Sequence, residues 1–150
     1  DGLLKKKKIV CKAFDAFPSS ITLKQSIPQD FNKNYYEKID KLNGEELTFV
    51  NRLDLDTLPN IKYWVRNREK TDPFYIQGWR KGKFYPDFVA VTKKGNIIAL
   101  EWKGGDRVSN EDTQYKIEIG EIWEKLDSKL CFFLVHTGNV EDVLKKIKEL

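Results

Sequence analysis

The chain contains no methionine, a single histidine and two cysteines among its 150 residues. One histidine, His136, defines no catalytic triad, so we do not expect a triad hydrolase. Cys11 and Cys131 are too few and too far apart in sequence for a disulfide framework or a zinc site. We expect Cys131, which opens the apolar run CFFLVH, to be a small core residue. We expect His136 to lie at the rim of the same strand.

Long apolar runs are also missing. No stretch approaches the roughly 18 uncharged apolar residues that span a bilayer, and no signal peptide precedes the first strand. We therefore expect a soluble, cytoplasmic protein with no membrane partner. A length of 150 residues suits one domain with its own core. Because the chain begins at Asp1 without an initiator methionine, we interpret it as a piece of a longer polypeptide.

The positive charge is unevenly distributed. Residues 1–12 hold five lysines and one aspartate, which accounts for the whole net charge of +4, so the rest of the chain is neutral. Within that rest, residues 62–83 hold seven basic residues, two acidic residues and five aromatic residues. Basic side chains among aromatic rings suit phosphate and base contacts, but strand aromatics are also typical core residues, so both interpretations stay open. The candidate DNA contacts are Arg66, Arg68, Lys81 and Lys83.

The hydrophobic pattern predicts an α/β domain over residues 34–150, preceded by an extended connector or edge strand over residues 1–33. An order of helix, strand meander, helix, strand and helix predicts a mixed central sheet flanked by helices. Helices are expected at residues 34–56, 111–126 and 140–150, and strands at residues 61–67, 74–79, 83–92, 96–104 and 131–137. The expected inward residues of the second helix are Tyr115, Ile119, Ile122, Trp123 and Leu126.

Two of these strands form a predicted hairpin that brings two carboxylates together. If residues 93–95 form a three-residue turn with the glycine in the left-handed conformation, Thr92 pairs with Asn96. The same register places Asp87 opposite Glu101. Two like charges at directly opposed positions destabilise a sheet unless a cation lies between them.

A divalent metal would provide that cation. Two carboxylates completed by water and phosphate oxygens are ligands that Mg²⁺ accepts. Alternation places Lys103 on the same face as Glu101 and Trp102 on the opposite face. The Lys103 ammonium is then placed to hold an attacking water or to stabilise charge on a phosphoryl group.

A simpler interpretation competes with this one. Glu101 and Lys103 also suit a surface salt bridge, and the short pattern of an acid, any residue and a lysine recurs at Asp127 and Lys129. The second occurrence sits in a polar connection with no apolar strand leading into it. The pattern alone is therefore weak evidence for a metal site.

Other acidic and basic residues add to the hypothesis. On a helical wheel of residues 34–56, Glu46 falls in the middle of the apolar stripe, where a carboxylate is costly unless it is paired. A metal-bound water or Lys103 would be a natural partner. Asp112 and Lys116 are spaced i,i+4 on the second helix and form either a surface ion pair or an auxiliary pair near the site. We favour the surface pair.

The order of these residues resembles the PD-(D/E)XK nuclease superfamily over roughly residues 40–137. Within it, the chain is most similar to the nuclease domain at the C-terminal end of type III restriction enzyme subunits and similar helicase-nuclease fusions. The resemblance is carried by Asn43-x-x-Glu46, Trp64-Val65-Arg66-Asn67, Tyr85-Pro86-Asp87-Phe88, Gly95, Glu101-Trp102-Lys103-Gly104, and the helix that bears Asp112 and Lys116.

The resemblance implies a restriction-endonuclease-like fold and Mg²⁺-dependent hydrolysis of DNA, with Mn²⁺ as an alternative metal. Asp87, Glu101 and Glu46 would be metal ligands, Lys103 the catalytic lysine and Lys116 an accessory catalytic contact. The implied partners are DNA, a helicase motor in the remainder of the same polypeptide, and a specificity or modification subunit. Trp102 departs from the smaller residue that is common between the acid and the lysine.

Two alternatives remain open at this point. One is a catalytically silent nucleic-acid-binding or docking module with the same fold, which the basic aromatic window at residues 62–83 would serve. The other is an interaction domain with no nucleic-acid role. A nuclease binds a divalent metal, whereas the silent module need not. Behaviour on a DNA column that does not change with salt would favour the interaction domain, because phosphate contacts are lost as salt rises.

Overall fold

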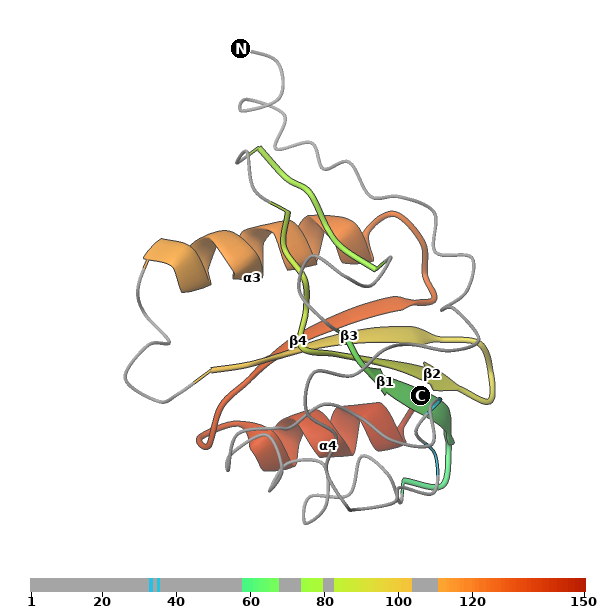
Figure 1. Cartoon of the computed structure of the whole chain (residues 1–150). Helices are drawn as coiled ribbons and strands as arrows, with labels where there is room; N and C mark the ends of the chain where they lie inside the picture. The colour runs from blue at the N-terminus through green and yellow to red at the C-terminus, as the bar shows by residue number, and fades with distance from the viewer. Residues whose placement is uncertain (1–32, 34, 36–57, 68–73, 80–82, 104–110) are drawn as a thin grey trace, which may run out of the picture.

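The computed structural model describes residues 33, 35, 58–67, 74–79, 83–103 and 111–150. They form a mixed α/β arrangement in which a four-stranded sheet lies between two helices, one on each face (Figure 1). This confirms the predicted α/β class and mixed sheet. The elements are β1 (Ile61–Arg66), β2 (Phe88–Thr92), β3 (Ile97–Trp102), α3 (Glu111–Glu124), β4 (Leu130–Val135) and α4 (Val140–Lys148). The predicted connector over 1–33 and helix over 34–56 lie almost entirely outside the described residues.

The first three strands form an antiparallel meander with the register expected from the turn. Phe88 pairs with Leu100, so partners on β2 and β3 follow the predicted pairing. The Thr92 N–H donates to the Asn96 carbonyl oxygen at 3.0 Å. Gly95 has φ +91°, a conformation that side chains with a Cβ rarely adopt. The prediction of a three-residue turn is therefore confirmed.

The fourth strand returns parallel to β3 after a crossover through α3. β3 is consequently a central strand with a helix over each face, which explains its run of Ile, Ala and Leu. One core lies under α4 and includes Trp64, Phe88 and Ile147. The other lies under α3 and includes Ile119 and Trp123. No helix in the described part of the chain is long and apolar enough to cross a membrane.

Three sequence predictions differ from the structure. The expected strand over 74–79 is reduced to isolated bridge residues, of which Ile76 pairs with Phe84, and β2 starts at Phe88 rather than at residue 83. Pro86 explains the shorter strand, because proline has no N–H to donate to a sheet. Leu126 is 59% exposed rather than buried. The predicted helix over 111–126 was too long, since α3 ends at Glu124.

Helix α3 and strand β4 approach each other closely at Gly120. We therefore expect alanine to destabilise the protein at this helical position, although alanine usually stabilises a helix relative to glycine. Gly120 is buried, and a Cβ there would lie 2.2 Å from the Phe132 ring. Alanine normally favours a helix over glycine by about 1 kcal/mol, but overpacking costs about 1–3 kcal/mol. We expect Gly120→Ala to lower the free energy of unfolding in urea. The double variant with Phe132→Leu should recover part of the loss, and a Gly120→Ala protein as stable as wild type would contradict this packing.

Candidate active site

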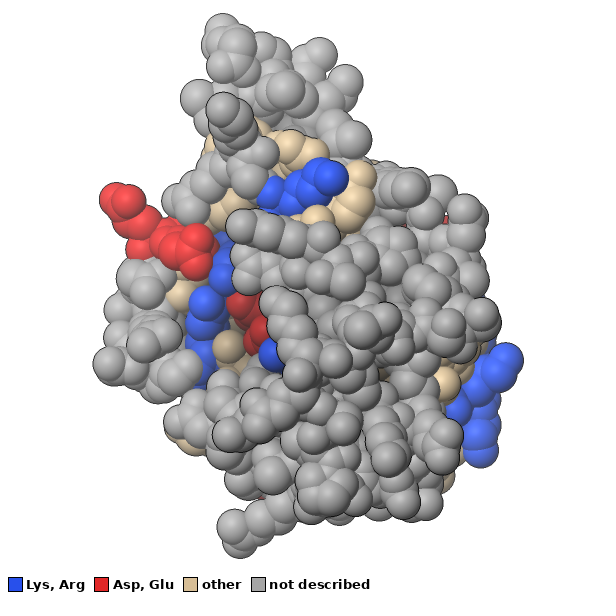
Figure 2. All heavy atoms as spheres, viewed as in Figure 1, with Lys and Arg blue, Asp and Glu red and all other residues tan. Residues whose placement is uncertain are grey.

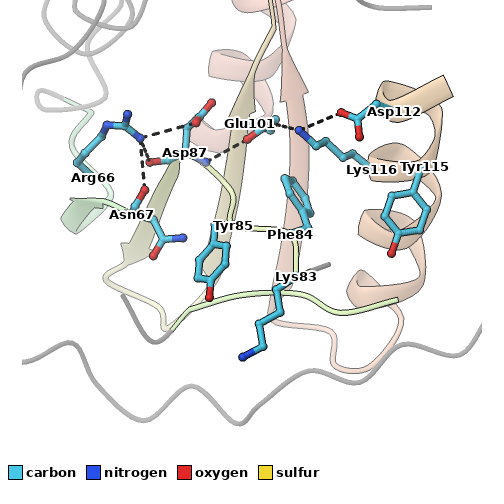
Figure 3. Close-up of a pocket in the computed structure, with 10 residues that line it drawn as sticks. All are labelled: Arg66, Asn67, Lys83, Phe84, Tyr85, Asp87, Glu101, Asp112, Tyr115 and Lys116. Atoms are coloured by element: carbon cyan, nitrogen blue, oxygen red, sulfur yellow. Dashed lines mark hydrogen bonds and ion pairs between the residues drawn. The ribbon is translucent and has the colours of Figure 1, made fainter. Parts of the chain in front are cut away.

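The ends of β1 and β3 and the beginning of β2 meet at one edge of the sheet, beside the first turns of α3. A pocket of about 380 Å³ opens there. In Figure 2, acidic and basic side chains lie against one another on the face shown. The pocket is lined by Arg66, Asn67, Lys83, Phe84, Tyr85, Asp87, Glu101, Asp112, Tyr115 and Lys116 (Figure 3).

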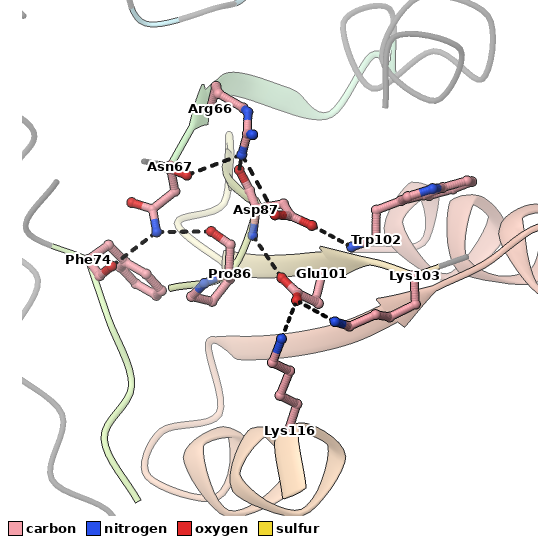
Figure 4. A network of polar contacts seen from close by, with 9 residues as sticks. All are labelled: Arg66, Asn67, Phe74, Pro86, Asp87, Glu101, Trp102, Lys103 and Lys116. Carbon is pink, nitrogen blue, oxygen red and sulfur yellow. Dashed lines mark hydrogen bonds and ion pairs between the residues drawn. The ribbon is translucent and has the colours of Figure 1, made fainter. Parts of the chain in front are cut away.

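The two carboxylates predicted to hold a metal lie together at this pocket. The Asp87 backbone N–H donates to Glu101 Oε1 at 3.2 Å. The Trp102 backbone N–H donates in turn to Asp87 Oδ2 at 2.9 Å. These reciprocal hydrogen bonds hold each carboxylate against the neighbouring strand (Figure 4). The structure therefore brings Asp87 and Glu101 to the same side of the sheet, as the turn geometry predicted, while Trp102 packs against the α4-side core.

Asp87 lies in an environment that disfavours its charged form. Burial raises the pKa of Asp87 to about 7, and the neighbouring Glu101 charge acts in the same direction. The Trp102 N–H and the Arg66 guanidinium partly oppose this rise. Arg66 Nη1 lies 3.7 Å from Asp87 Oδ1. A carboxylate pair of this kind would be stabilised by an added cation.

Glu101 is the more deeply buried of the two acids, with 4% of its surface exposed. Its Oε2 atom accepts a hydrogen bond from Lys116 Nζ at 2.9 Å, and Lys103 Nζ lies 3.5 Å away. Both ammonium groups also face Asp112, at 3.3 Å from Lys116 and 3.9 Å from Lys103. Glu101 therefore has two cationic partners (Figure 4), and this buried network replaces the simple surface salt bridge that the sequence left open.

The two lysines differ in their electrostatic environment. Burial by itself would lower the pKa of Lys116, but the charge and hydrogen bond of Glu101 outweigh burial and raise that pKa above its ordinary value. Burial lowers the pKa of Lys103, and contact with Lys116 lowers it further, against the attraction of Glu101. The pKa of Lys116 is thus raised beside Glu101, whereas the pKa of Lys103 is lowered.

The favoured interpretation of Asp112 and Lys116 as a surface pair was wrong. The i,i+4 ion pair exists, but the Lys116 side chain is only 18% exposed and reaches across to Glu101. Its ammonium also lies 5.1 Å from the centre of the Phe84 ring. Helical spacing identified the pair but carried no information about the strand that lies opposite the helix.

Asn67 ends one of the runs that carry the resemblance, but the sequence hypothesis gave it no role. It is 1% exposed, and its backbone N–H donates to the Asp87 carbonyl oxygen at 2.9 Å. Its Nδ2 group donates to the carbonyl oxygens of Phe74 and Pro86. These bonds fix the backbone around Pro86 and Asp87. An asparagine at the end of the predicted strand over 61–67, where its amide would be buried, was the signal available in the sequence.

The predicted DNA contacts divide into two groups. Arg66 and Lys83 line the pocket, with Arg66 held against Asp87 and Lys83 exposed to solvent. Arg68 and Lys81 lie outside the described residues. Glu46, the predicted third carboxylate, also lies outside them.

Two other candidates are explained by local structure. The Lys129 backbone N–H donates to Asp127 Oδ1, so this acid-x-Lys pattern closes a turn. His136 Nδ1 accepts from the Gly138 N–H just after β4, as expected of a rim residue.

By ligand chemistry, the site suits a hard dication, because Asp87 and Glu101 supply carboxylate oxygens beside an open pocket. The described residues contain no group of three or more histidine, cysteine or acidic side chains arranged to hold a metal. Within the described part of the chain, the fit consequently depends on these two carboxylates, with water and phosphate oxygens as the remaining ligands.

The sequence matches no protein-family model, and no curated protein or solved structure shows significant similarity to it.

Proposed function

We propose that this chain is a metal-dependent DNA endonuclease domain of the PD-(D/E)XK type. One observation carries the proposal: the Asp87 and Glu101 carboxylates converge beside two lysine ammonium groups at an open pocket. An anionic pair flanked by cations suits a dication and a phosphodiester together. The mixed sheet with a helix on each face is compatible with the restriction-endonuclease-like fold that this proposal includes.

Asp87 and Glu101 would hold Mg²⁺, with Mn²⁺ as an alternative. When bound, such a dication supplies Lewis-acid polarisation and neutralises charge at the scissile phosphate. Arg66 and the Trp102 N–H orient the Asp87 carboxylate. Lys116 fixes Glu101 through its direct hydrogen bond. Each ligand is therefore oriented by a neighbouring group, which is the usual support for a metal site.

Lys103 has a different role in this proposal. Its ammonium lies near Glu101, and its pKa is lowered whereas that of Lys116 is raised. Such a group can donate a hydrogen bond to the phosphate as negative charge develops during hydrolysis, or orient a water molecule for in-line attack. Asp112 helps to hold both lysines in place.

The proposal includes the molecular context implied by the resemblance. The domain would act in the cytoplasm on DNA, joined to a helicase motor elsewhere in its own polypeptide. A separate specificity or modification subunit would supply sequence recognition. The basic and aromatic residues around the pocket support a nucleic-acid partner.

A specific observation favours one alternative function. Two lysine ammonium groups of the chain itself balance the charge of Glu101, so the network is also compatible with a silent nucleic-acid-binding module. Calorimetric titration with Mn²⁺ distinguishes the two, because the nuclease binds one or more dications and a silent module need not.

The direct test is cleavage of supercoiled and linear DNA by the purified chain in Mg²⁺ or Mn²⁺, with EDTA as the blank. We expect metal-dependent strand breaks, and Lys103→Met should slow cleavage at least about 100-fold because a cation at the developing charge is lost. Lys148→Met, at an exposed position of α4, is the matched control. Equal cleavage by the Lys103→Met and wild-type chains would remove Lys103 from the mechanism. No cleavage by the wild type in either metal would count against the nuclease.

A further inference from the structure

The segment that leads into Asp87 has an alternating pattern of exposure. Lys83 is exposed and Tyr85 and Asp87 are partly exposed, whereas the residues at positions 84, 86 and 88 are buried. Side chains that alternate in this way lie on one side of an extended chain. In Figure 3, Lys83 and Tyr85 lie on this segment below the two carboxylates. A chain of accessible groups therefore leads from solvent to the candidate catalytic site.

A second tyrosine from another segment lies beside the first. The Tyr75 and Tyr85 ring centres are 5.9 Å apart, with the ring planes inclined at 49°. The Lys83 ammonium lies 4.4 Å from the centre of the Tyr75 ring. The paired backbone hydrogen bonds between Ile76 and Phe84 hold the two segments together. We call Tyr75, Tyr85 and Lys83 the tyrosine shelf.

Among the residues that the structure describes, neither shelf tyrosine belongs to the hydrophobic core. The neighbours of Tyr75 are almost fully buried, since Phe74 is 3% exposed and Ile76 is inaccessible, and Phe84 next to Tyr85 is also buried. Of the aromatic residues in the basic window, Trp64 and Phe74 thus belong to the core, as one interpretation of the sequence predicted. The two shelf tyrosines remain partly exposed on a well-packed base. Rigid aromatic groups at a basic surface are typical of nucleobase stacking sites.

We propose that the tyrosine shelf binds unpaired nucleotides of single-stranded DNA and leads that strand to the carboxylates. Inside a duplex, both faces of each base are covered by neighbouring base pairs, so away from the duplex ends a protein ring can stack only on a base that is unpaired or displaced. Lys83 would contact the phosphate of the stacked nucleotide. The inference rests on the proposed nuclease function for what happens to the strand, but the binding itself needs no metal. The preferred substrate is then a single strand or a junction between single-stranded and duplex DNA.

Binding is tested with the purified chain in EDTA, so that no cleavage occurs. Fluorescence anisotropy would compare a labelled oligonucleotide of about 20 nucleotides with its blunt duplex. We expect the single strand to bind at least about tenfold more tightly. Tyr85→Leu and Tyr75→Leu should each weaken single-strand binding by about 5–30-fold, which corresponds to about 1–2 kcal/mol for the stacking of a base on an aromatic ring. Tyr85→Phe should bind like wild type.

Further variants distinguish the stacking of bases on the tyrosines from general electrostatic attraction between the protein and DNA phosphates. Lys83→Ala should weaken binding and reduce its salt dependence, whereas Lys129→Ala, at an exposed position after α3, should change neither. Circular dichroism confirms that each variant is folded. Equal affinity for the two DNA forms, no measurable DNA binding, or full affinity of both leucine variants would overturn the shelf.

Cleavage assays in Mg²⁺ or Mn²⁺ keep the two proposals distinguishable. If the chain cleaves duplex DNA but does not bind single strands preferentially, the nuclease function stands and the role of the tyrosine shelf is wrong. If the chain binds single strands through the tyrosine shelf but cleaves no DNA, the role of the shelf stands and the nuclease function is wrong.

Discussion

Replacing Asp87 with asparagine should abolish metal-dependent cleavage and, at the same time, make the domain more stable near neutral pH. Asparagine keeps the size of the side chain and an oxygen that can accept the Trp102 N–H, but it removes the negative charge that a dication requires. We expect cleavage to fall at least about 100-fold. The gain in stability arises because the metal-free protein holds the partly buried Asp87 charge beside Glu101.

The raised pKa of Asp87 determines whether the stability of the domain rises or falls with pH. Burial and the Glu101 charge raise the pKa of Asp87 from 3.8 to about 7. Between these values the folded state keeps a proton that the unfolded chain has released, so stability falls as pH rises through this window and levels off above it. An asparagine side chain cannot ionise. The free energy of unfolding of the Asp87→Asn variant should therefore exceed that of wild type by about 1–3 kcal/mol near pH 8, and it should no longer fall with pH through this window on account of residue 87.

Thermal unfolding of the metal-free protein across this pH range measures the effect. A gain of this size raises Tm by roughly 3–10 °C for a domain of this length. Asp142→Asn, at an exposed position of α4, is the matched control and should change Tm little. A lower Tm for Asp87→Asn at high pH, or unchanged cleavage, would contradict the account of this residue.

Replacing Glu101 with glutamine should also abolish cleavage but should destabilise the protein. Two lysine ammonium groups, each 18% exposed, lie within 4 Å of the Glu101 carboxylate. Glutamine removes their main counter-charge and leaves the half-exposed Asp112 as their remaining acidic partner among the described residues. Removing one member of a buried charge network costs about 3–5 kcal/mol, and partial exposure of the lysines reduces this to about 2–4 kcal/mol.

Urea unfolding near neutral pH checks this prediction. Glu121→Gln, which removes an exposed carboxylate from α3, is the matched control and should lie within about 0.5 kcal/mol of wild type. Because Glu101 also contributes to the raised pKa of Asp87, Glu101→Gln should weaken the pH dependence that Asp87 causes. The two carboxylates would then have the same role in catalysis and opposite effects on stability. Equal stability changes in the two variants would refute this distinction.

The geometry of the hairpin was predictable because local rules determine it. The turn at residues 93–95 sets the register, and the register brings Asp87 opposite Glu101. The alternation of side chains along a strand likewise placed Trp102 on the opposite face of the sheet from Glu101 and Lys103. These features depend on residues that are close in sequence and on fixed strand geometry.

Features that depend on packing between distant segments were not predictable. The position of Lys116 against Glu101 depends on where α3 crosses the sheet, and helical spacing alone suggested a surface pair. The role of Asn67 depends on carbonyl oxygens of Phe74 and Pro86, which lie well apart along the chain. Leu126 was misplaced because the predicted helix over 111–126 continued past the end of α3 at Glu124.

The most direct measurement is a crystal of this chain soaked in Mn²⁺, with the metal located by its anomalous scattering. The account predicts a peak at the pocket within about 2.0–2.6 Å of an oxygen from Asp87 and an oxygen from Glu101. Absence of Mn²⁺ from these two carboxylates at millimolar metal, or its presence only elsewhere on the protein, would contradict the proposed metal site.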